Sequence, residues 1–301
     1  MADSLFEKIQ ENLEFYLKTF DYISSIYKPF IVSALLILVA TFVTVFGSVL
    51  LGYLIGFLIF LALVAISAAF PPLALLGVAA LPIAIVLAFL FIMAVVMVLA
   101  GIADSVYLEL LYGALARKEK WDYPDWLNRV LGLFSSGINS ALPYAGIRIV
   151  FGLITLAIVG IVLLPVLIAV VLLGIGAGPL GIVGAFFGLY GMLFLGIIVL
   201  IPVRIVVNFL DKAAIVHRKL SGDGIIASVK WALDYALLKS GHRTFSLAGI
   251  IIELLAVLVS IIPIISIIAP YVAYLANCGS IMRAELPAEA EAKEKPRGRR
   301  K

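Results

Sequence analysis

Three long stretches of the chain carry no charged residue, and they set the first expectation about its structure. They are Phe30–Ala103, Ile149–Val203 and Leu254–Met282. A helix that crosses a bilayer needs about 20 consecutive apolar residues, so these stretches are long enough for several crossings. The pattern predicts an all-α fold, a polytopic transmembrane helical bundle.

Proline and glycine residues divide each charge-free stretch into two halves, because both residue types favour turns. The dividing residues are Pro71, Pro72, Pro82, Gly176, Gly178, Pro179 and Pro263. Six spans are therefore predicted, at 30–66, 82–116, 141–173, 180–210, 244–262 and 264–284. The first is far longer than the ~30 Å hydrocarbon core requires, so we expect it to tilt, to project beyond the membrane or to break near residues 47–56.

Each predicted pair of spans follows a segment in which apolar residues recur every three or four positions, as on one face of a helix. These segments are residues 6–27, 122–140 and 221–241. The chain thus has the pattern of three repeats of an amphipathic helix plus a transmembrane hairpin, at about 3–118, 121–219 and 221–285, within one integral membrane domain, 1–286. The amphipathic helices lie either in the headgroup layer or as extensions packed on one another.

Composition and charge agree with this prediction. Hydrophobic residues make up 64% of the chain and charged residues 13%, whereas a soluble domain has roughly 25% charged residues, so that class is excluded. Lys and Arg gather in residues 1–28, 117–129, 212–243 and beyond 283. By the positive-inside rule these segments face the cytoplasm, which predicts a multi-pass protein of the cell membrane with both termini cytoplasmic. Residues 287–301 are expected to form a disordered basic tail.

The segment 208–245, "NFLDKAAIVHRKLSGDGIIASVKWALDYALLKSGHRTF", and the segment 111–126, "LYGALARKEKWDYPDW", carry a family resemblance. They resemble the non-catalytic membrane domain of glycerophosphoryl diester phosphodiesterases and related uncharacterised polytopic membrane proteins of bacteria and archaea. That family commonly has an acidic residue after the apolar triplet, where this chain has His217 and Arg218. The resemblance implies a six-span membrane protein and transfers no catalytic residue, because the phosphodiesterase activity belongs to a separate soluble domain.

Motifs that carry enzymatic chemistry are scarce. The two histidines, His217 and His242, lie in basic connections and are expected to be solvated, and Cys278 is the single cysteine. No HExxH or CxxC spacing occurs, so neither a metal site nor a cofactor is predicted. The glycines of "GIGAGPLG" at 174–181 lack the Lys-Ser/Thr ending of a phosphate loop and are expected to form a turn. The sequence predicts a protein that is not an enzyme and does not bind nucleic acid.

The charged residues inside the predicted spans include Asp104, Glu109, Arg148, Arg204 and Glu253. A charge at mid-membrane costs about 2.5–3.5 kcal/mol on the insertion scale, and short carboxylates cannot reach the headgroups. We therefore predict one intramembrane charge cluster in which Glu253 contacts at least one of the two arginines. Such a cluster either joins hairpins structurally or lines a cytoplasm-facing pocket for a ligand.

Small residues are spaced for helix packing in two of the spans. Gly52 and Gly56, and likewise Gly184 and Gly188, each lie four positions apart on one helix face. In lipid, close packing at small residues holds helices together. These glycines are expected to form packing surfaces, either within the chain or in a homo-oligomer.

These patterns lead to a functional hypothesis and one alternative. The hypothesis is an integral membrane protein without catalytic activity, a membrane-embedded binding, assembly or lipid-organising module. Its partners would be membrane lipids and either a homo-oligomer or an unidentified membrane protein. The alternative is a transporter or channel that uses the charged cavity for an anionic or proton-coupled substrate.

Overall fold

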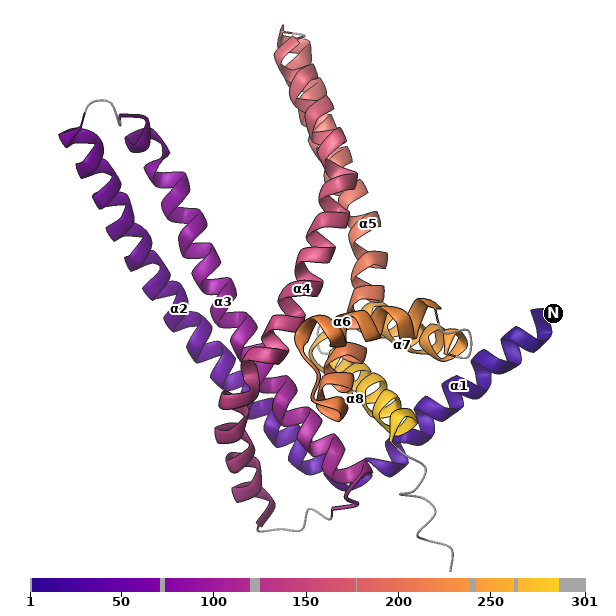
Figure 1. Cartoon of the computed structure of the whole chain (residues 1–301). Helices are drawn as coiled ribbons and strands as arrows, with labels where there is room; N and C mark the ends of the chain where they lie inside the picture. The colour runs from indigo at the N-terminus through magenta and orange to yellow at the C-terminus, as the bar shows by residue number, and fades with distance from the viewer. Residues whose placement is uncertain are drawn as a thin grey trace, which may run out of the picture. The chain divides into compact units, whose positions relative to one another are not determined.

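A computed structural model describes residues 2–70, 74–119, 125–176, 178–238, 242–262 and 265–286 of the chain (Figure 1). Over these residues the chain is helical and holds no strand. The helices are α1 (Ala2–Tyr22), η1 (Ser24–Ile26), α2 (Tyr27–Ala69), α3 (Ala74–Leu115), α4 (Asp125–Gly176), α5 (Gly178–Ser221), α6 (Ile225–Leu233), the π-helical turn η3 (Asp234–Leu238), α7 (Arg243–Val259) and α8 (Ile265–Glu285).

Four helices of the described residues are long and apolar enough to cross a membrane. They lie within Ser24–Ala69, Ile83–Leu115, Asp125–Pro165 and Phe194–Ser221, and they correspond to the first four predicted spans. To this extent the prediction of a helical membrane protein is confirmed. The fifth and sixth spans fall on α7 and α8 and stay predictions, as does the threefold repeat.

Two details of the predicted elements differ from the structure. α2 runs without interruption from Tyr27 to Ala69, so the first span does not break at residues 47–56. The second amphipathic segment is no separate helix, because residues 125–140 are the first turns of α4. The helix continues through Gly137 and Pro143 into the following span, although both residue types favour turns. Of the predicted dividing residues, Pro71, Pro72 and Pro263 lie outside the described residues, as does the tail 287–301. Pro82 lies within α3, Gly176 ends α4, and Gly178 and Pro179 begin α5.

The chain divides into two compact units whose boundaries do not follow the predicted repeats. Unit 1 comprises residues 1–26, 111–120 and 146–301, and unit 2 comprises residues 27–110 and 121–145. The first amphipathic helix therefore belongs to unit 1, while the hairpin that follows it in sequence belongs to unit 2.

Unit 2 contains the paired helices α2 and α3, which run alongside each other in Figure 1. Near one end of the pair the rings of Phe30 and Tyr107 lie 4.7 Å apart. The α3 helix also meets the start of α4, where the hydroxyls of Ser105 and Ser140 are 2.6 Å apart. A β-carbon added to Gly101 would collide with the backbone of α4 at Ala141 and Ala145, so glycine allows these two helices to approach closely.

In unit 1, the C-terminal half of α5 is surrounded by other helices. It contacts α6, α7 and α8, and α1 packs on both α7 and α8. As a result, α5 is buried on all sides from Phe209 to Val216, including the two charged residues Asp211 and Lys212. The apolar triplet Ala214–Val216 belongs to this buried part of α5, so its side chains contact the surrounding helices rather than solvent.

Candidate functional site

A buried polar group of unit 1 consists of Lys212, Glu253 and Asn277, which we call the polar node. Lys212 comes from α5, Glu253 from the middle of α7 and Asn277 from α8. The Lys212 Nζ and the Asn277 Nδ2 both donate hydrogen bonds to Oε1 of Glu253. The side chains of Lys212 and Glu253 are 10% and 4% exposed, and Asn277 is fully buried. The node therefore ties three helices together at one carboxylate oxygen, where each charge compensates the other.

Aromatic side chains and one close-packed glycine surround the polar node. The Lys212 Nζ lies 6.0 Å from the centre of the Tyr274 ring. One turn before Glu253, Gly249 faces Phe209 and Tyr16, and a β-carbon there would lie 2.7 Å from the Tyr16 hydroxyl. That hydroxyl donates to the Phe245 carbonyl at 3.4 Å. Burial, followed by the neighbouring Tyr235, Glu253 and Cys278, raises the pKa of Tyr16, so its phenol stays protonated at neutral pH.

A second ion pair lies beside the polar node. An Nη1 of Arg148 on α4 is 3.3 Å from Oδ2 of Asp211 on α5. Their side chains are 29% and 10% exposed, so water screens this pair more than it screens the node. Because Asp211 and Lys212 are consecutive, one turn of α5 joins α4 through a carboxylate and α7 through an ammonium group.

The structure corrects the predicted pairing of Glu253. Its basic partner is Lys212, not Arg148 or Arg204. The reason is that α7 packs on the C-terminal half of α5, which places Glu253 opposite Lys212, about two turns after Arg204. Arg204 is exposed on α5, and its side chain makes no ion pair or hydrogen bond with the residues that the structure describes. Asp104 is 1% exposed and belongs to unit 2.

Sequence reasoning missed Lys212, Asp211 and Asn277. The charge pattern places Lys212 in a basic cytoplasmic segment, because nothing local shows that α6, α7 and α8 enclose the end of α5. Asn277 did carry a signal, since it is a polar amide inside the charge-free stretch 254–282. Buried amides usually have a hydrogen-bond partner, so this residue pointed to a polar neighbour on another helix.

The two histidines lie in a stack of rings instead of being solvated. His217 stacks on Trp231 at 4.3 Å, Trp231 on Tyr235 at 4.6 Å, and Tyr235 on His242 at 4.5 Å. The Nε2 of His217 also lies 3.0 Å from Oδ2 of Asp223. The stack connects the end of α5 to α6, to η3 and to the start of α7. Within the described part of the chain, no group of three or more His, Cys, Asp or Glu side chains is arranged to hold a metal ion.

Tyr235 makes a testable contribution to stability at high pH. Burial and the nearby Glu285 raise its pKa well above the ordinary value of about 10, so the folded state binds the phenolic proton more tightly than the unfolded state. Its stabilising effect is complete below pH ~10 and is lost as the pH rises above that value. We expect Tyr235→Phe to flatten the decline of the melting temperature between pH 9 and pH 11.

The expected change is checked by thermal melting with a thiol-reactive dye, because Cys278 is buried and reacts only on unfolding. At pH 7 the variant is expected to be at least as stable as the parent, since the buried Tyr235 hydroxyl has no hydrogen-bond partner among the described residues. The exposed Tyr53→Phe serves as the control. An unchanged alkaline slope in Tyr235→Phe would contradict the assignment.

The predicted packing glycines occupy different environments. Gly52 and Gly56 on α2 face α3: a β-carbon at Gly52 would lie 3.4 Å from Ile92, and one at Gly56 would lie 3.3 Å from the Ala84 carbonyl oxygen. On α5, a β-carbon at Gly184 would meet nothing within 4 Å, and Gly188 is half-buried. The first pair therefore makes a close approach to another helix, whereas Gly184 does not.

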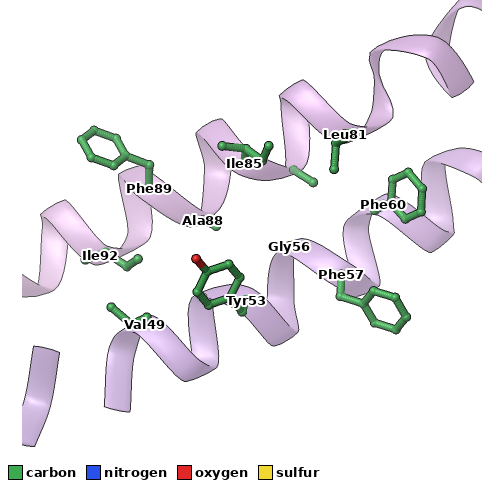
Figure 2. Close-up of a pocket in the computed structure, with 12 residues that line it drawn as sticks. Val49, Tyr53, Gly56, Phe57, Phe60, Leu81, Ile85, Ala88, Phe89 and Ile92 are labelled. Atoms are coloured by element: carbon green, nitrogen blue, oxygen red, sulfur yellow. The ribbon is translucent and has the colours of Figure 1, made fainter. Parts of the chain in front are cut away.

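An apolar groove of about 600 Å³ lies along α2 and α3 at this close approach, and we call it the hairpin groove. Figure 2 shows Gly56 and Ala88 between the two helices, with the Tyr53 ring beside them. The side chains of Phe57 and Phe89 point outward from the pair. The groove is lined by Val49, Gly52, Tyr53, Gly56, Phe57, Phe60, Leu81, Ala84, Ile85, Ala88, Phe89 and Ile92.

A second apolar groove, of about 320 Å³, lies between α1, α7 and α8 in unit 1. Tyr16, Leu17 and Phe20 of the amphipathic helix α1 form one wall, and Leu17 is 65% exposed. Small residues of α8, among them Ala269 and Ala276, form the opposite wall. Neither this groove nor the hairpin groove is lined by Arg148, Arg204 or Glu253.

Comparison with protein-family models, with characterised proteins and with solved structures found no match to this chain. The resemblance to the membrane domain of glycerophosphoryl diester phosphodiesterases therefore stays a prediction.

Proposed function

We propose that this chain is a non-enzymatic membrane module that organises lipid or assembles with other membrane proteins. The observation that supports the proposal is that the buried charges of unit 1 compensate one another, while the described grooves are apolar. Lys212 and Asn277 share one oxygen of Glu253, and Arg148 pairs with Asp211. A charged transport pathway needs charged side chains along a cavity, and neither of these two grooves is lined by one.

The proposal also covers the number of spans, the threefold repeat and the orientation of the termini. The hairpin α7–α8 completes three repeats and six spans, and both termini face the cytoplasm of a cell. α7 has 17 residues, which extend about 26 Å, slightly less than the ~30 Å core. The polar node supports the crossing of α7, because a carboxylate can enter lipid when a neighbouring cation compensates it. The resemblance of residues 208–245 to a non-catalytic membrane domain favours the same function.

Two measurements, of lipid retained on purification and of ion flux in liposomes, distinguish the proposed function from the transporter alternative. The full chain is purified in mild detergent and examined by native mass spectrometry, and it is also reconstituted into liposomes. We expect copurified lipid or a stoichiometric protein partner, and no anion or proton flux above that of empty liposomes. Flux that Arg148→Gln abolishes, in protein that retains neither lipid nor a partner, would establish the transporter alternative instead.

A further inference from the structure

The apolar surface of α2 is longer than a bilayer can cover. At the start of the helix, Pro29, Phe30, Ser33 and Ile37 are buried, whereas the only buried residues between 38 and 69 are Ser48, Gly52 and Gly56. This uncovered part extends about 48 Å at 1.5 Å per residue. At the average tilt of about 20° it needs roughly 45 Å of apolar depth, and the hydrocarbon core supplies about 30 Å.

The excess length carries large apolar side chains. Leu58, Leu61 and Phe70 are 56%, 46% and 60% exposed near the turn that joins α2 to α3. On α3, Leu81 and Ile85 are 56% and 59% exposed. No charged residue lies between Phe30 and Ala103, so this part of the hairpin has no charge that would favour water. Hydrophobic mismatch of this kind promotes association between helices.

The hairpin groove is the surface at which this association would take place. Its floor consists of small residues, Gly52 and Gly56 with Ala84 and Ala88, and large rings stand beside it. Tyr53 is 74% exposed, and Phe57 and Phe89 are 56% and 59% exposed. Figure 2 shows Phe57 and Phe89 directed away from the hairpin that bears them, so they are available to a neighbouring molecule. One surface thus presents both a recess of small residues and projecting rings, as a self-complementary contact requires.

We propose that two copies of this chain associate through their α2–α3 hairpins, with aromatic side chains of each copy in the hairpin groove of the other. A second copy is the occupant that fits the mismatch, because its hairpin has the same excess length and covers the neighbour along its full height. Lipid covers only the part that lies within the hydrocarbon core. The inference rests on the proposed role in assembly and names the partner.

Cysteine crosslinking in the membrane tests this arrangement. Cys278 is the single cysteine, so Cys278→Ala gives a cysteine-free full-length chain. Two differently tagged copies, one with Phe57→Cys and one with Phe89→Cys, are expressed together and treated with a short bismaleimide. We expect a crosslinked dimer that carries both tags, at a yield at least fivefold above that of paired copies with Leu156→Cys. Leu156 on α4 is the matched control, because it is 68% exposed and lies outside the hairpin.

A groove-filling variant makes the test specific. Ile85 lines the groove and is 59% exposed, so a larger side chain there fills the groove without entering the α2–α3 contact. Ile85→Trp is added to both tagged copies, and we expect it to reduce the crosslink to the control level while the helical content measured by circular dichroism stays unchanged. Crosslinking no higher than the Leu156→Cys control, or insensitive to Ile85→Trp, would overturn the dimer. Native mass spectrometry separates the two proposals: a monomer with bound lipid refutes the dimer and leaves the lipid-organising function standing.

Discussion

Replacing Glu253 with alanine is expected to lower the free energy of unfolding by about 3–5 kcal/mol, because Lys212 is then left charged and buried without its carboxylate. Asn277 loses its acceptor in the same variant, which adds to the loss. The measurement is denaturant unfolding in detergent, followed by the reaction of buried Cys278 with a thiol-reactive dye.

Two further variants show that the effect comes from the unpaired charge. Glu14→Ala removes the partner of Lys18 in an exposed ion pair on α1, and we expect it to cost less than about 1 kcal/mol. In the double variant Lys212→Met with Glu253→Gln, both charges are absent and the Gln oxygen can still accept from Asn277. This variant is expected to recover most of the loss. Equal destabilisation in the single and double variants would show that the ion pair is unimportant.

Gly101→Ala is the second substitution with a large expected effect. The new β-carbon would lie 3.0 Å from the backbone nitrogen of Ala145 and would collide with the carbonyl oxygen of Ala141. Both are backbone atoms of α4, so relief requires a shift of the whole helix rather than of one side chain. We expect a loss of at least about 1–3 kcal/mol, the usual cost of overpacking a core.

The matched control is Gly152→Ala on α4, where an added β-carbon meets nothing within 4 Å. Because alanine favours helix over glycine by up to about 1 kcal/mol, this control is expected to be neutral or stabilising. Both variants are melted by the same dye assay in the same detergent. If Gly101→Ala is as stable as Gly152→Ala, then α3 and α4 do not approach each other as described.

The charged residues show where sequence reasoning succeeded and where it failed. The sequence predicts that Glu253 contacts at least one of Arg148 and Arg204, because a short carboxylate in an apolar stretch needs a compensating cation. It is 3% exposed and bonded to Lys212. The arginine partner was wrong, because the choice among Arg148, Arg204 and Lys212 depends on which turn of α5 faces α7. Residue depth along a single helix does not determine that contact.

The amphipathic segments show the same limit. The apolar stripe in residues 6–27 predicted a helix, and α1 is one. The stripe alone could not tell that α1 packs on α7 and α8, which lie more than 200 residues later in the chain. Hydroxyls of Thr19 on α1 and Ser280 on α8 are 3.1 Å apart in that contact. Such a pairing leaves no periodic signal, because each hydroxyl is one polar residue on an apolar face.

The sequence by itself determined that this chain is helical and that several of its helices suit a membrane, because both properties depend on local composition and on the spacing of apolar residues. Only the tertiary structure decided which cation meets Glu253, why Lys212 is buried, and which glycines face another helix. Each of these depends on where helices distant in sequence cross, and the crossing is set by the summed packing of many side chains on both helices.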